Sequence, residues 1–507
     1  MALALAAMGA VALWRTLPFL GPVPTEGLYN SDSAIPVLMS NLATGAPVDW
    51  LFWGQDRFGS WPFLLARAGG ALAGRAWTPE AMHVLRTLWM VAALVPWVAL
   101  AGRAGLMAGA GLLLLPGLNP LLRSVLTDLG TVDGWQLPSL LWAWWGLRRA
   151  SRGERVGGWL ALAGVAAALA SWTSLVSAPL LLMLGLLEGA GAHVPGRRRA
   201  LLVVPAFGGA LVEWGVRTAW HAAIRARGWR DVRTPARLDT GHLVENLGQV
   251  ARVAWSVEAV PWVVAARACA AVALVGGRVR SWGSGRGTVV GAGAACATSF
   301  LVVVAVRHVR DNAYAPRYLG VGLAFAVLGV SVAAGLSVRA LIERRRPGAG
   351  AGVLAVLALA AVVLGVPRAG PDPRESVLRP AAEEIGRRFP GAVYVGGYWW
   401  TYALAALLPP WTVILVPREG EWNRRPDWAA SLRSGRPVLV GRPDIPTGPP
   451  PASLVAYGTV LVLAEPDVVV LRPFPGESTG ERLSLYRTAA GSPGSPAAAG
   501  APPAHER

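Results

Sequence analysis

The sequence has no lysine, only two cysteines and few charged residues of either sign. Charged side chains make up 15% of the 507 residues, against about 25% in soluble domains, which excludes an ordinary water-soluble globule. All 47 basic residues are arginines, so the net charge of +18 indicates a coding bias and not nucleic-acid binding. Cys269 and Cys296 lie in separate apolar segments, which excludes a disulfide framework or a metal-thiolate site built from closely spaced cysteines.

Apolar residues, by contrast, form 54% of the chain and recur in long runs. Runs of this kind predict a polytopic α-helical membrane protein. A span needs roughly 20 predominantly apolar residues, and Trp, Gly and Pro complete several of the shorter runs. We predict about 11 transmembrane helices, near residues 3–20, 84–101, 104–116, 136–147, 156–171, 175–189, 200–216, 260–276, 288–305, 318–338 and 349–366.

Clusters of arginine between these runs predict the orientation. If the spans alternate, four clusters fall on one side, which the positive-inside rule assigns to the cytoplasm. The four clusters lie at 148–155, 197–199, 278–286 and 344–346. We therefore predict an integral protein of a bacterial inner or plasma membrane, with a cytoplasmic N-terminus, a first outer loop at 21–83 and an extracytoplasmic C-terminal region. The first span lacks a basic start and is predicted to be an uncleaved anchor, not a signal peptide.

The hydrophobic pattern changes after residue 366, where the predicted transmembrane domain (1–366) ends. Between 367 and 475, short β-branched runs alternate with helical stretches, which predicts a small extracytoplasmic α/β domain. Strands are expected at 393–395, 412–416, 438–440, 460–463 and 468–471, and helices at 374–389, 398–408 and 427–433. The Gly396-Gly397-Tyr398 turn lacks the spacing of a dinucleotide loop, so no cofactor is assigned there. Residues 476–507, rich in Pro, Gly, Ala and Ser, are predicted to be disordered.

The first outer loop begins with a polar segment that carries a carboxylate, Tyr29-Asn30-Ser31-Asp32-Ser33. Apolar residues then recur at helical spacing up to Leu42, which predicts a short amphipathic helix lying along the membrane surface. A second apolar helix is expected over 61–72. From the local pattern alone Asp32 is a helix N-cap, a role that is compatible with a chemical one.

Three short stretches, together with this layout, resemble a known family. They are Asn30-Ser31-Asp32-Ser33-Ala34, Trp53-Gly54-Gln55-Asp56-Arg57-Phe58-Gly59, and Arg317-Tyr318 at the start of a late span. With the external helix and the C-terminal soluble domain, they resemble GT-C-fold glycosyltransferases, the polytopic enzymes related to protein O-mannosyltransferases and lipid A aminoarabinose transferases. The related enzymes often have an acidic pair at the position of Asp32, whereas serines flank it here.

The resemblance implies an inverting glycosyltransferase. Its donor would be a polyprenyl-phosphate sugar, which is a lipid-linked substrate and not a cofactor, and its acceptor a lipid, glycan or protein of the cell envelope. In this family an acidic residue of the first loop engages the acceptor, which implies that role for Asp32. A polyprenyl donor also implies contact with membrane lipids.

The chemistry of sugar transfer agrees with these residue types. A carboxylate can take the proton of the attacking group, so Asp32 is predicted to be the general base. Asp56 is predicted to be a second catalytic carboxylate that orients the acceptor or binds a divalent metal. Arg57 is predicted to hold phosphate, because a guanidinium can bind phosphate through two hydrogen bonds. The alternative for Asp56 and Arg57 is a local ion pair at the surface.

A second group of candidates lies at the predicted outer mouth of the ninth and tenth spans. Arg310, Arg317 and Tyr318 are predicted to bind the donor, since so many basic groups on the outer side run against the positive-inside trend. The alternative is that these side chains reach along the helix to the membrane interface. His308 is predicted to be a polar loop residue, because no second His lies at a metal-ligand spacing.

The second predicted outer loop, 117–135, contains two further carboxylates, Asp128 and Asp133. The local pattern favours turn and cap residues, with Asp133-Gly134 as a turn. The alternative is that both approach the cavity of Asp32.

Two other functions are compatible with the sequence. A transporter or flippase of a lipid-linked intermediate would carry ionisable residues inside its spans and show repeated halves, whereas here the ionisable groups gather in outer loops and no repeat is visible. A non-catalytic envelope assembly protein would tolerate the loss of Asp32 and Asp56. Glycosyl transfer is therefore the leading prediction.

Overall fold

The computed structural model describes a helical bundle and parts of the C-terminal region. The described residues are 6–8, 10, 31–53, 58–190, 194–229, 238–275, 285–345, 350–365, 379, 382–383, 386–387, 393–396, 398–408, 414–417, 438–441, 460–461 and 485–486.

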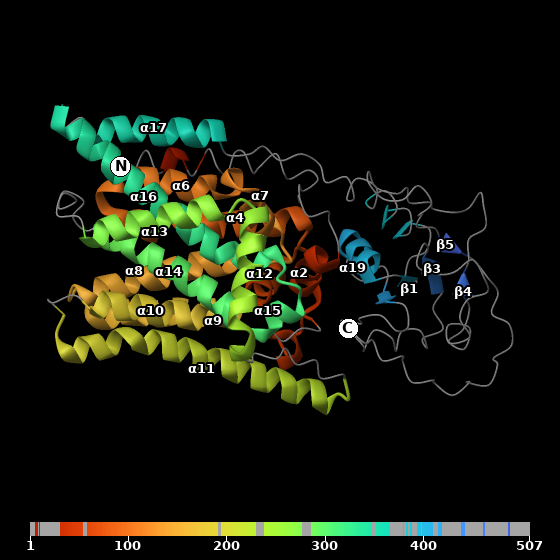
Figure 1. Ribbon diagram of the computed structural model, residues 1–507. Coiled ribbons are helices and arrows are strands. Elements are labelled where there is room, and N and C mark those ends of the chain that lie inside the picture. Colours follow the sequence, from red (N-terminus) through yellow and green to blue (C-terminus); the bar gives the residue numbers. More distant parts are fainter. Residues whose placement is uncertain are drawn as a thin grey trace.

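Most helices of the bundle run roughly side by side, with α11 along one edge and α17 along the opposite one (Figure 1). The helices are α2 (Ser31–Leu42), α3 (Trp61–Ala73), α4 (Pro79–Ala92), α5 (Leu94–Ala101), α6 (Gly105–Leu118), α7 (Pro120–Thr127), α8 (Asp133–Ser151), α9 (Val156–Thr173), α10 (Ser177–Gly189), α11 (Gly196–Ala226), α12 (Leu243–Ser256), α13 (Val260–Val275), α14 (Gly285–Ala305), α15 (Arg307–Asp311), α16 (Gly320–Arg345) and α17 (Gly350–Gly365). Short 3-10 turns include η2 (Pro47–Asp49), η3 (Gly102–Ala104), η4 (Thr240–His242) and η6 (Pro316–Leu319).

Local sequence signals fix several helix starts. Thr78 caps α4 by accepting a hydrogen bond from the N–H of Ala81, and a proline follows at the first helical position. Asn119 does the same for α7, where Oδ1 accepts from the N–H groups of Leu121 and Leu122. Such caps satisfy backbone donors that the helix itself leaves without partners.

The predicted spans coincide with helices wherever the chain is described. The ten apolar runs from 84 onward all fall on helices of the bundle, whereas the run at 3–20 lies largely outside the described residues. By length and composition, five helical stretches of the described chain could cross a membrane, or six if the α12–α13 pair, bent by 106°, forms one span. The number of eleven spans and their orientation stay predictions.

The longest of these stretches, Pro79–Leu118, folds back on itself. The backbone turns at Gly102, whose φ is +58°, a conformation that glycine adopts without steric cost. The indole N–H of Trp97 donates to the carbonyl of Ala108 at 3.0 Å, although eleven residues of continuous helix would separate them by about 16 Å. The stretch therefore consists of two antiparallel legs, as the separate predicted spans at 84–101 and 104–116 require.

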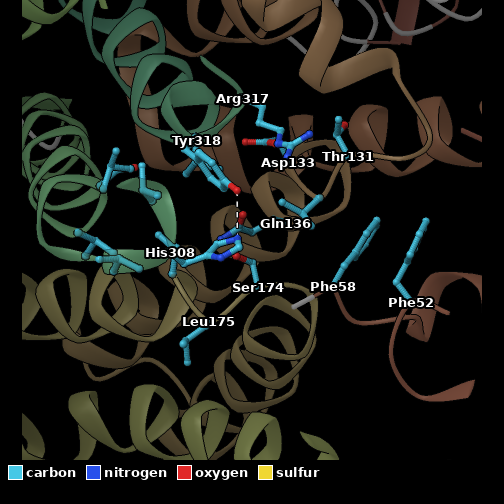
Figure 2. A pocket seen from close by; sticks show the side chains of 18 of the residues that line it. Phe52, Phe58, Thr131, Asp133, Gln136, Ser174, Leu175, His308, Arg317 and Tyr318 are labelled. Atoms are coloured by element: carbon cyan, nitrogen blue, oxygen red, sulfur yellow. Dashed lines mark hydrogen bonds between the residues drawn. The ribbon is translucent and has the colours of Figure 1, made fainter. Parts of the chain in front are cut away.

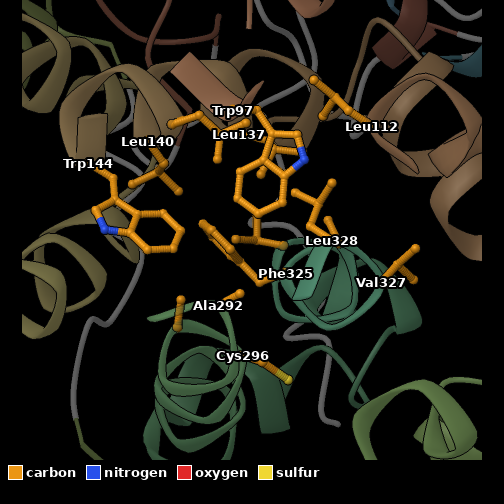
Figure 3. Packing of buried hydrophobic residues seen from close by; sticks show 14 of the residues in the cluster. Trp97, Leu112, Leu137, Leu140, Trp144, Ala292, Cys296, Phe325, Val327 and Leu328 are labelled. Atoms are coloured by element: carbon orange, nitrogen blue, oxygen red, sulfur yellow. The ribbon is translucent and has the colours of Figure 1, made fainter. Parts of the chain in front are cut away.

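The core lies where α5, α8, α14 and α16 meet (Figure 3). The ring of Trp144 lies 6.1 Å from that of Trp97 and 6.4 Å from that of Phe325, measured between centroids. Gly291 lets α14 approach α8, because a Cβ at that position would collide with the Trp144 indole. Interlocked aromatic and small residues of this kind give helix pairs in a bundle one close arrangement.

At the far end of α8 lies a group of polar residues that we call the closed cluster: Arg148, Glu188, Thr288 and the carbonyl of Leu100. The guanidinium of Arg148 donates to Glu188 at 2.9 and 2.7 Å, to Thr288 at 2.5 Å and to Leu100 at 3.2 Å. Only 6% of the Arg148 side chain and 12% of the Glu188 side chain are exposed. The cluster therefore ties four helices together through hydrogen-bonded charges.

The helix α2 forms as predicted, but it does not lie along a surface. Its residues from Ser33 to Asn41 are buried. The polar ones among them are satisfied internally: Ser40 donates to the carbonyl of Pro36, and Asn41 donates to the carbonyl of Trp77 and accepts from its N–H. Because small polar side chains can be satisfied within a helix and by its neighbours, their presence on α2 did not require contact with water or lipid headgroups.

The C-terminal region contains short strands: β1 (Val393–Gly396), β2 (Ile414–Pro417), β3 (Val438–Gly441), β4 (Val460–Leu461) and β5 (Leu485–Tyr486). The parallel order is β2-β1-β3-β4, and β5 pairs with β3 in the antiparallel sense. Four predicted strands therefore correspond to observed ones, while 468–471 lies outside the described residues. β5 falls in the segment predicted to be disordered, where Leu485 and Tyr486 provide a short apolar pair. The boundaries of a separate α/β domain at 367–475 stay a prediction.

Helix α19 (Tyr398–Leu407) connects this region to the bundle. Figure 1 shows it between the strands and α2, and Tyr402, Ala403 and Leu404 are completely buried in the cluster formed with α2. A second link is the ion pair between Arg379 and Glu80. This cover contributes to the burial of residues 33–41 of α2.

Candidate functional site

A cavity of about 440 Å³ lies where one set of helix ends meets (Figure 2). Its polar and charged residues are Asp32, Asp128, Thr131, Asp133, Gln136, Ser174, Arg217, Ser299, His308, Arg317 and Tyr318. Its apolar residues are Phe52, Phe58, Val132, Leu175, Val176, Ala178, Pro179, Val302, Val303, Val306, Val309 and Val321. One wall is therefore suited to charge and another to hydrocarbon.

Asp32 lines this cavity from the first turn of α2, where it is partly exposed. The segment of Asp128 packs on the same turn, because the hydroxyl of Ser33 donates to Oδ1 of Asp128 at 2.8 Å. Gly130 permits this approach, since a Cβ there would lie 2.7 Å from the carbonyl carbon of Asp32. Two carboxylates distant in sequence are thus held on adjoining pieces of backbone.

Asp128 is the C-cap of α7, as the local pattern predicts, and it also lines the cavity. Its Oδ1 accepts a second hydrogen bond from the N–H of Gly130 at 2.9 Å. Burial raises the pKa of Asp128, and the negative charge of Asp32 adds to the rise, while the hydrogen bonds and Arg86 oppose it. This carboxyl therefore holds a proton more readily than an exposed aspartate does.

Arg86, on α4, supports this segment from behind. Only 2% of the residue is exposed, and its guanidinium donates to the carbonyl of Asp128 and, at 3.2 Å, to the hydroxyl of Thr131. Gly134 leaves room for it, because a Cβ at that position would collide with the guanidinium. A buried cation thus holds the backbone that carries the carboxylates of the cavity.

Asp133 begins α8, so the prediction of a turn at Asp133-Gly134 is wrong: the absent side chain of Gly134 accommodates Arg86. The residue is 5% exposed, and its carboxylate lies at the junction of η6 and α16. There the N–H of Val321 donates to it, and a Cβ on Gly320 would lie 2.6 Å from Oδ1. Burial raises the pKa of Asp133 to about 7, against the opposing charge of Arg86 and its own and Val321 backbone hydrogen bonds.

Arg317 and Tyr318 line the cavity from η6, and His308 from α15. Figure 2 shows the Tyr318 hydroxyl directed at Nε2 of His308, 3.1 Å away. The guanidinium of Arg317 lies 5.5 Å from the centroid of the Tyr318 ring and is exposed. Within the described part of the chain, no hydrogen bond or ion pair engages the Arg317 side chain. His308 is thus part of the wall of the cavity and not only a loop residue.

Arg310 has a different place. It does not line the cavity, and its guanidinium pairs with Asp239 at 2.7 Å. Burial would raise the pKa of Asp239, but hydrogen bonds from His242 and Asn246 and the charge of Arg310 outweigh it and lower the pKa. This network joins α15 to the start of α12, so the geometry gives Arg310 a structural role and offers no support for donor binding.

Asp56 and Arg57 lie outside the described residues, so their predicted roles stay predictions. Phe52 and Phe58, which lie before and after the undescribed stretch 54–57, line the cavity. Their rings are stacked with centroids 5.1 Å apart, as Figure 2 shows.

Several polar residues of the cavity wall were not among the predicted site residues, including Gln136, Ser174 and Arg217. The arginine series that begins at Arg217 is, from sequence, most simply an amphipathic helix on anionic headgroups. In the structure Arg217 belongs to α11, lines the cavity and pairs with Glu213 at 2.5 Å. The spacing of four between Glu213 and Arg217 on a helix was a usable signal. Gln136 and Ser174 gave none, because isolated polar residues near helix ends are common.

The described residues offer no group of three or more His, Cys, Asp or Glu side chains arranged to hold a metal ion. A divalent metal at Asp56, the alternative role for that residue, stays a prediction because Asp56 lies outside the described residues, and we derive no chemistry through a metal.

No family model matches the sequence, and no curated protein matches it. Solved structures match it in fold. Two are structures of ArnT from Cupriavidus metallidurans, in the apo state and bound to undecaprenyl phosphate, with TM-scores of 0.52 and 0.54 and identities of 14% and 15%. The alignments cover 94% and 96% of this chain and 96% and 97% of the ArnT chain.

A third match is the archaeal oligosaccharyltransferase AglB from Archaeoglobus fulgidus, in complex with an inhibitory peptide and a dolichol-phosphate. It has a TM-score of 0.45 and 12% identity and covers 80% of this chain and 64% of its own. The ArnT alignments, which run over nearly the whole of both chains, carry the conclusion: this chain has the GT-C fold.

Proposed function

We propose that the protein is an inverting glycosyltransferase that moves a sugar from a polyprenyl-phosphate donor to an acceptor of the cell envelope. One observation supports this above the others: Asp32, Asp128, Arg317 and Tyr318 line the same cavity, which also has an apolar wall. The fold is shared with ArnT, one structure of which is bound to undecaprenyl phosphate, and a lipid phosphate of that class suits this cavity.

Asp32 is the proposed general base. The acceptor's hydroxyl or amino group attacks the anomeric carbon, a new bond forms there, and the bond from that carbon to the phosphate oxygen breaks. The proton of the attacking group passes to the Asp32 carboxylate, and the electron pair of the broken bond leaves with the polyprenyl phosphate. Asp128, held beside the Asp32 backbone, adds the second carboxyl group that orients the acceptor.

Arg317 and Tyr318 are the proposed donor-phosphate ligands. A guanidinium stabilises negative charge that develops on a departing phosphate, and a phenol adds one hydrogen bond. Arg317 has no ion pair within the described residues, so it can take an anionic ligand without first breaking one. The valines of α14 and the residues of the α9–α10 turn form the apolar wall, which suits the isoprenoid units next to the phosphate.

The test is transfer of radiolabel from a polyprenyl-phosphate sugar in membrane vesicles. Asp32→Asn should lower the transfer rate by about 10²- to 10⁴-fold, the usual effect of removing a general base. Two variants serve as controls, Asp311→Asn and Arg307→Ala. Both change the charge in the same way as variants of the cavity, yet Asp311 and Arg307 do not line it and are 39% and 48% exposed in their side chains.

Undiminished transfer by Asp32→Asn would overturn the proposed base. Movement of the lipid across the bilayer without any transfer of sugar would instead favour the transporter alternative.

A further inference from the structure

The carboxylate of Asp133 occupies a position that the proposed mechanism does not use. It lines the cavity from the start of α8, next to the segment that presents Arg317 and Tyr318. The contact is close, because a Cβ on Gly320 would lie 2.6 Å from Oδ1 of Asp133. Figure 2 shows Asp133 and Arg317 together at one side of the cavity.

The charges around Asp133 come from four elements. Arg86 on α4 and Arg317 on η6 act on it as cations. Asp128 lies five residues earlier on the same supported backbone, and Asp32 faces Asp128 from α2. An anion entering beside Arg317 is therefore attracted by guanidinium groups and repelled by carboxylates, of which Asp133 contacts the segment that carries Arg317.

The proposed reaction changes the charge of the lipid that sits there. A polyprenyl-phosphate sugar is a phosphodiester with a single negative charge. The product, a polyprenyl phosphate monoester, carries about −1.5 to −2 at neutral pH. Binding groups that are all positive would hold this product more tightly than the donor and would slow each turnover.

Building on the proposed function, we infer that Asp133 makes the cavity discriminate against the lipid phosphate monoester and so promotes release of the product. Asp133 is a positioning residue and not a catalytic one. Its carboxylate contacts the segment that carries Arg317, acts on the bound lipid through its negative charge and forms no bond with the sugar. If the extra negative charge of the product lies roughly 6 Å from the carboxylate, in a medium of effective dielectric 20 to 80, the repulsion weakens binding of the monoester by about three- to a hundredfold. Because the cavity is partly exposed to solvent, we expect binding to be weakened about five- to tenfold.

The experiment measures two dissociation constants by calorimetry at pH 8 in detergent: that of farnesyl phosphate and that of its methyl diester. The quantity of interest is the ratio of the monoester to the diester constant. Asp133→Asn should lower this ratio about five- to tenfold relative to wild type. Asp133→Ser, a smaller neutral replacement, gives the same comparison where the asparagine variant fails to fold.

Asp311→Asn is the matched control, since it removes the same charge outside the cavity and should leave the ratio unchanged. A product-release role also predicts that, in the transfer assay, the concentration of farnesyl phosphate needed for half inhibition falls in Asp133→Asn. A general structural defect would not produce this selective fall.

The outcomes separate the two proposals. Binding of both lipids with the same ratio in wild type and in the folded Asp133 variants would overturn this inference and leave the proposed function intact. Failure of wild type to bind either lipid would overturn the proposed function, and this inference with it.

Discussion

Two arginines at opposite ends of the bundle show how the same side chain serves different purposes. Arg148 is buried and donates hydrogen bonds to Glu188, Thr288 and the carbonyl of Leu100. Arg317 is exposed in the cavity and engages no hydrogen-bond or ion-pair partner within the described chain. The two regions lie about 22 Å apart, the rise of α8 from Asp133 to Arg148.

Satisfaction of hydrogen bonds, and not charge alone, therefore distinguishes an arginine with a structural role from one that we propose binds a ligand. In the closed cluster the partners are helices of the protein itself. In the cavity the cation lacks such a partner, which is the state expected of a group that awaits a ligand.

Replacement of Arg148 should damage the fold. In Arg148→Met the Glu188 carboxylate stays buried without its cation, which costs about 3–5 kcal/mol of unfolding free energy. Thermal or denaturant unfolding in detergent measures the loss. The double variant Arg148→Met/Glu188→Leu removes both charges and should regain much of it. A single variant as stable as wild type would contradict the distinction between the two arginines.

Replacement of Arg317 should leave the fold intact and weaken binding of the ligand. Arg317→Ala loses no internal hydrogen bond, so its unfolding midpoint should match that of wild type within error. A lost charge-assisted contact to phosphate corresponds to about 10- to 100-fold weaker binding of a farnesyl phosphate diester. Calorimetry checks the binding, and Arg307→Ala is the control. Equal affinity in Arg317→Ala and wild type would remove Arg317 from the donor site.

The stability of the folded protein should depend on pH through the ionisation of Asp133. Because burial raises the pKa of Asp133 from 3.8 to about 7, the folded state binds this proton more tightly than the unfolded state does. The stabilising contribution is complete below about pH 4 and is lost as the pH rises through 7. Relative to wild type, Asp133→Asn should therefore gain thermal stability between pH 5 and pH 8, by about a few degrees. A difference that stays constant with pH would contradict the raised pKa.

The smallest effect is expected at an ion pair whose two partners are both exposed. Arg307 pairs with Asp311 at 3.5 Å, and 48% and 39% of their side chains are exposed. Such pairs contribute less than about 1 kcal/mol. Arg307→Ala should shift the unfolding midpoint only slightly, whereas a shift as large as that of Arg148→Met would show that pairing matters more than burial.

The sequence predicts the bundle well because apolar runs of membrane length favour helices almost regardless of their neighbours. It also predicts the helix at 31–42. Motifs near helix ends identify Asp32, Arg317 and Tyr318 as candidate residues of one site. The surface position of that helix was wrong, since nothing in residues 31–42 records that α19, far along the chain, covers it.

The cavity itself depends on contacts that no local pattern contains. Asp128 and Asp133 look like ordinary cap and turn residues until Arg86 and the glycines at 130 and 134 bring them to the wall. Arg310 and Arg317 are equivalent candidates from sequence, and only the structure shows that Arg310 pairs with Asp239 outside the cavity while Arg317 lines it. Local sequence thus identifies residue types, while long-range packing decides which of them share a site.

The docking of α19 on α2 has a consequence for biosynthesis. Leu42 and Tyr398 are separated by 355 residues, which a ribosome needs roughly 20 to 70 seconds to add. During that interval the first-loop helix has been made but lacks its cover, so its apolar face is open to chaperones, proteases and neighbouring chains. The packing around the helix that carries the proposed base is therefore completed only after most of the chain has been made, and a nascent chain that stops before α19 exposes the same surface to quality control.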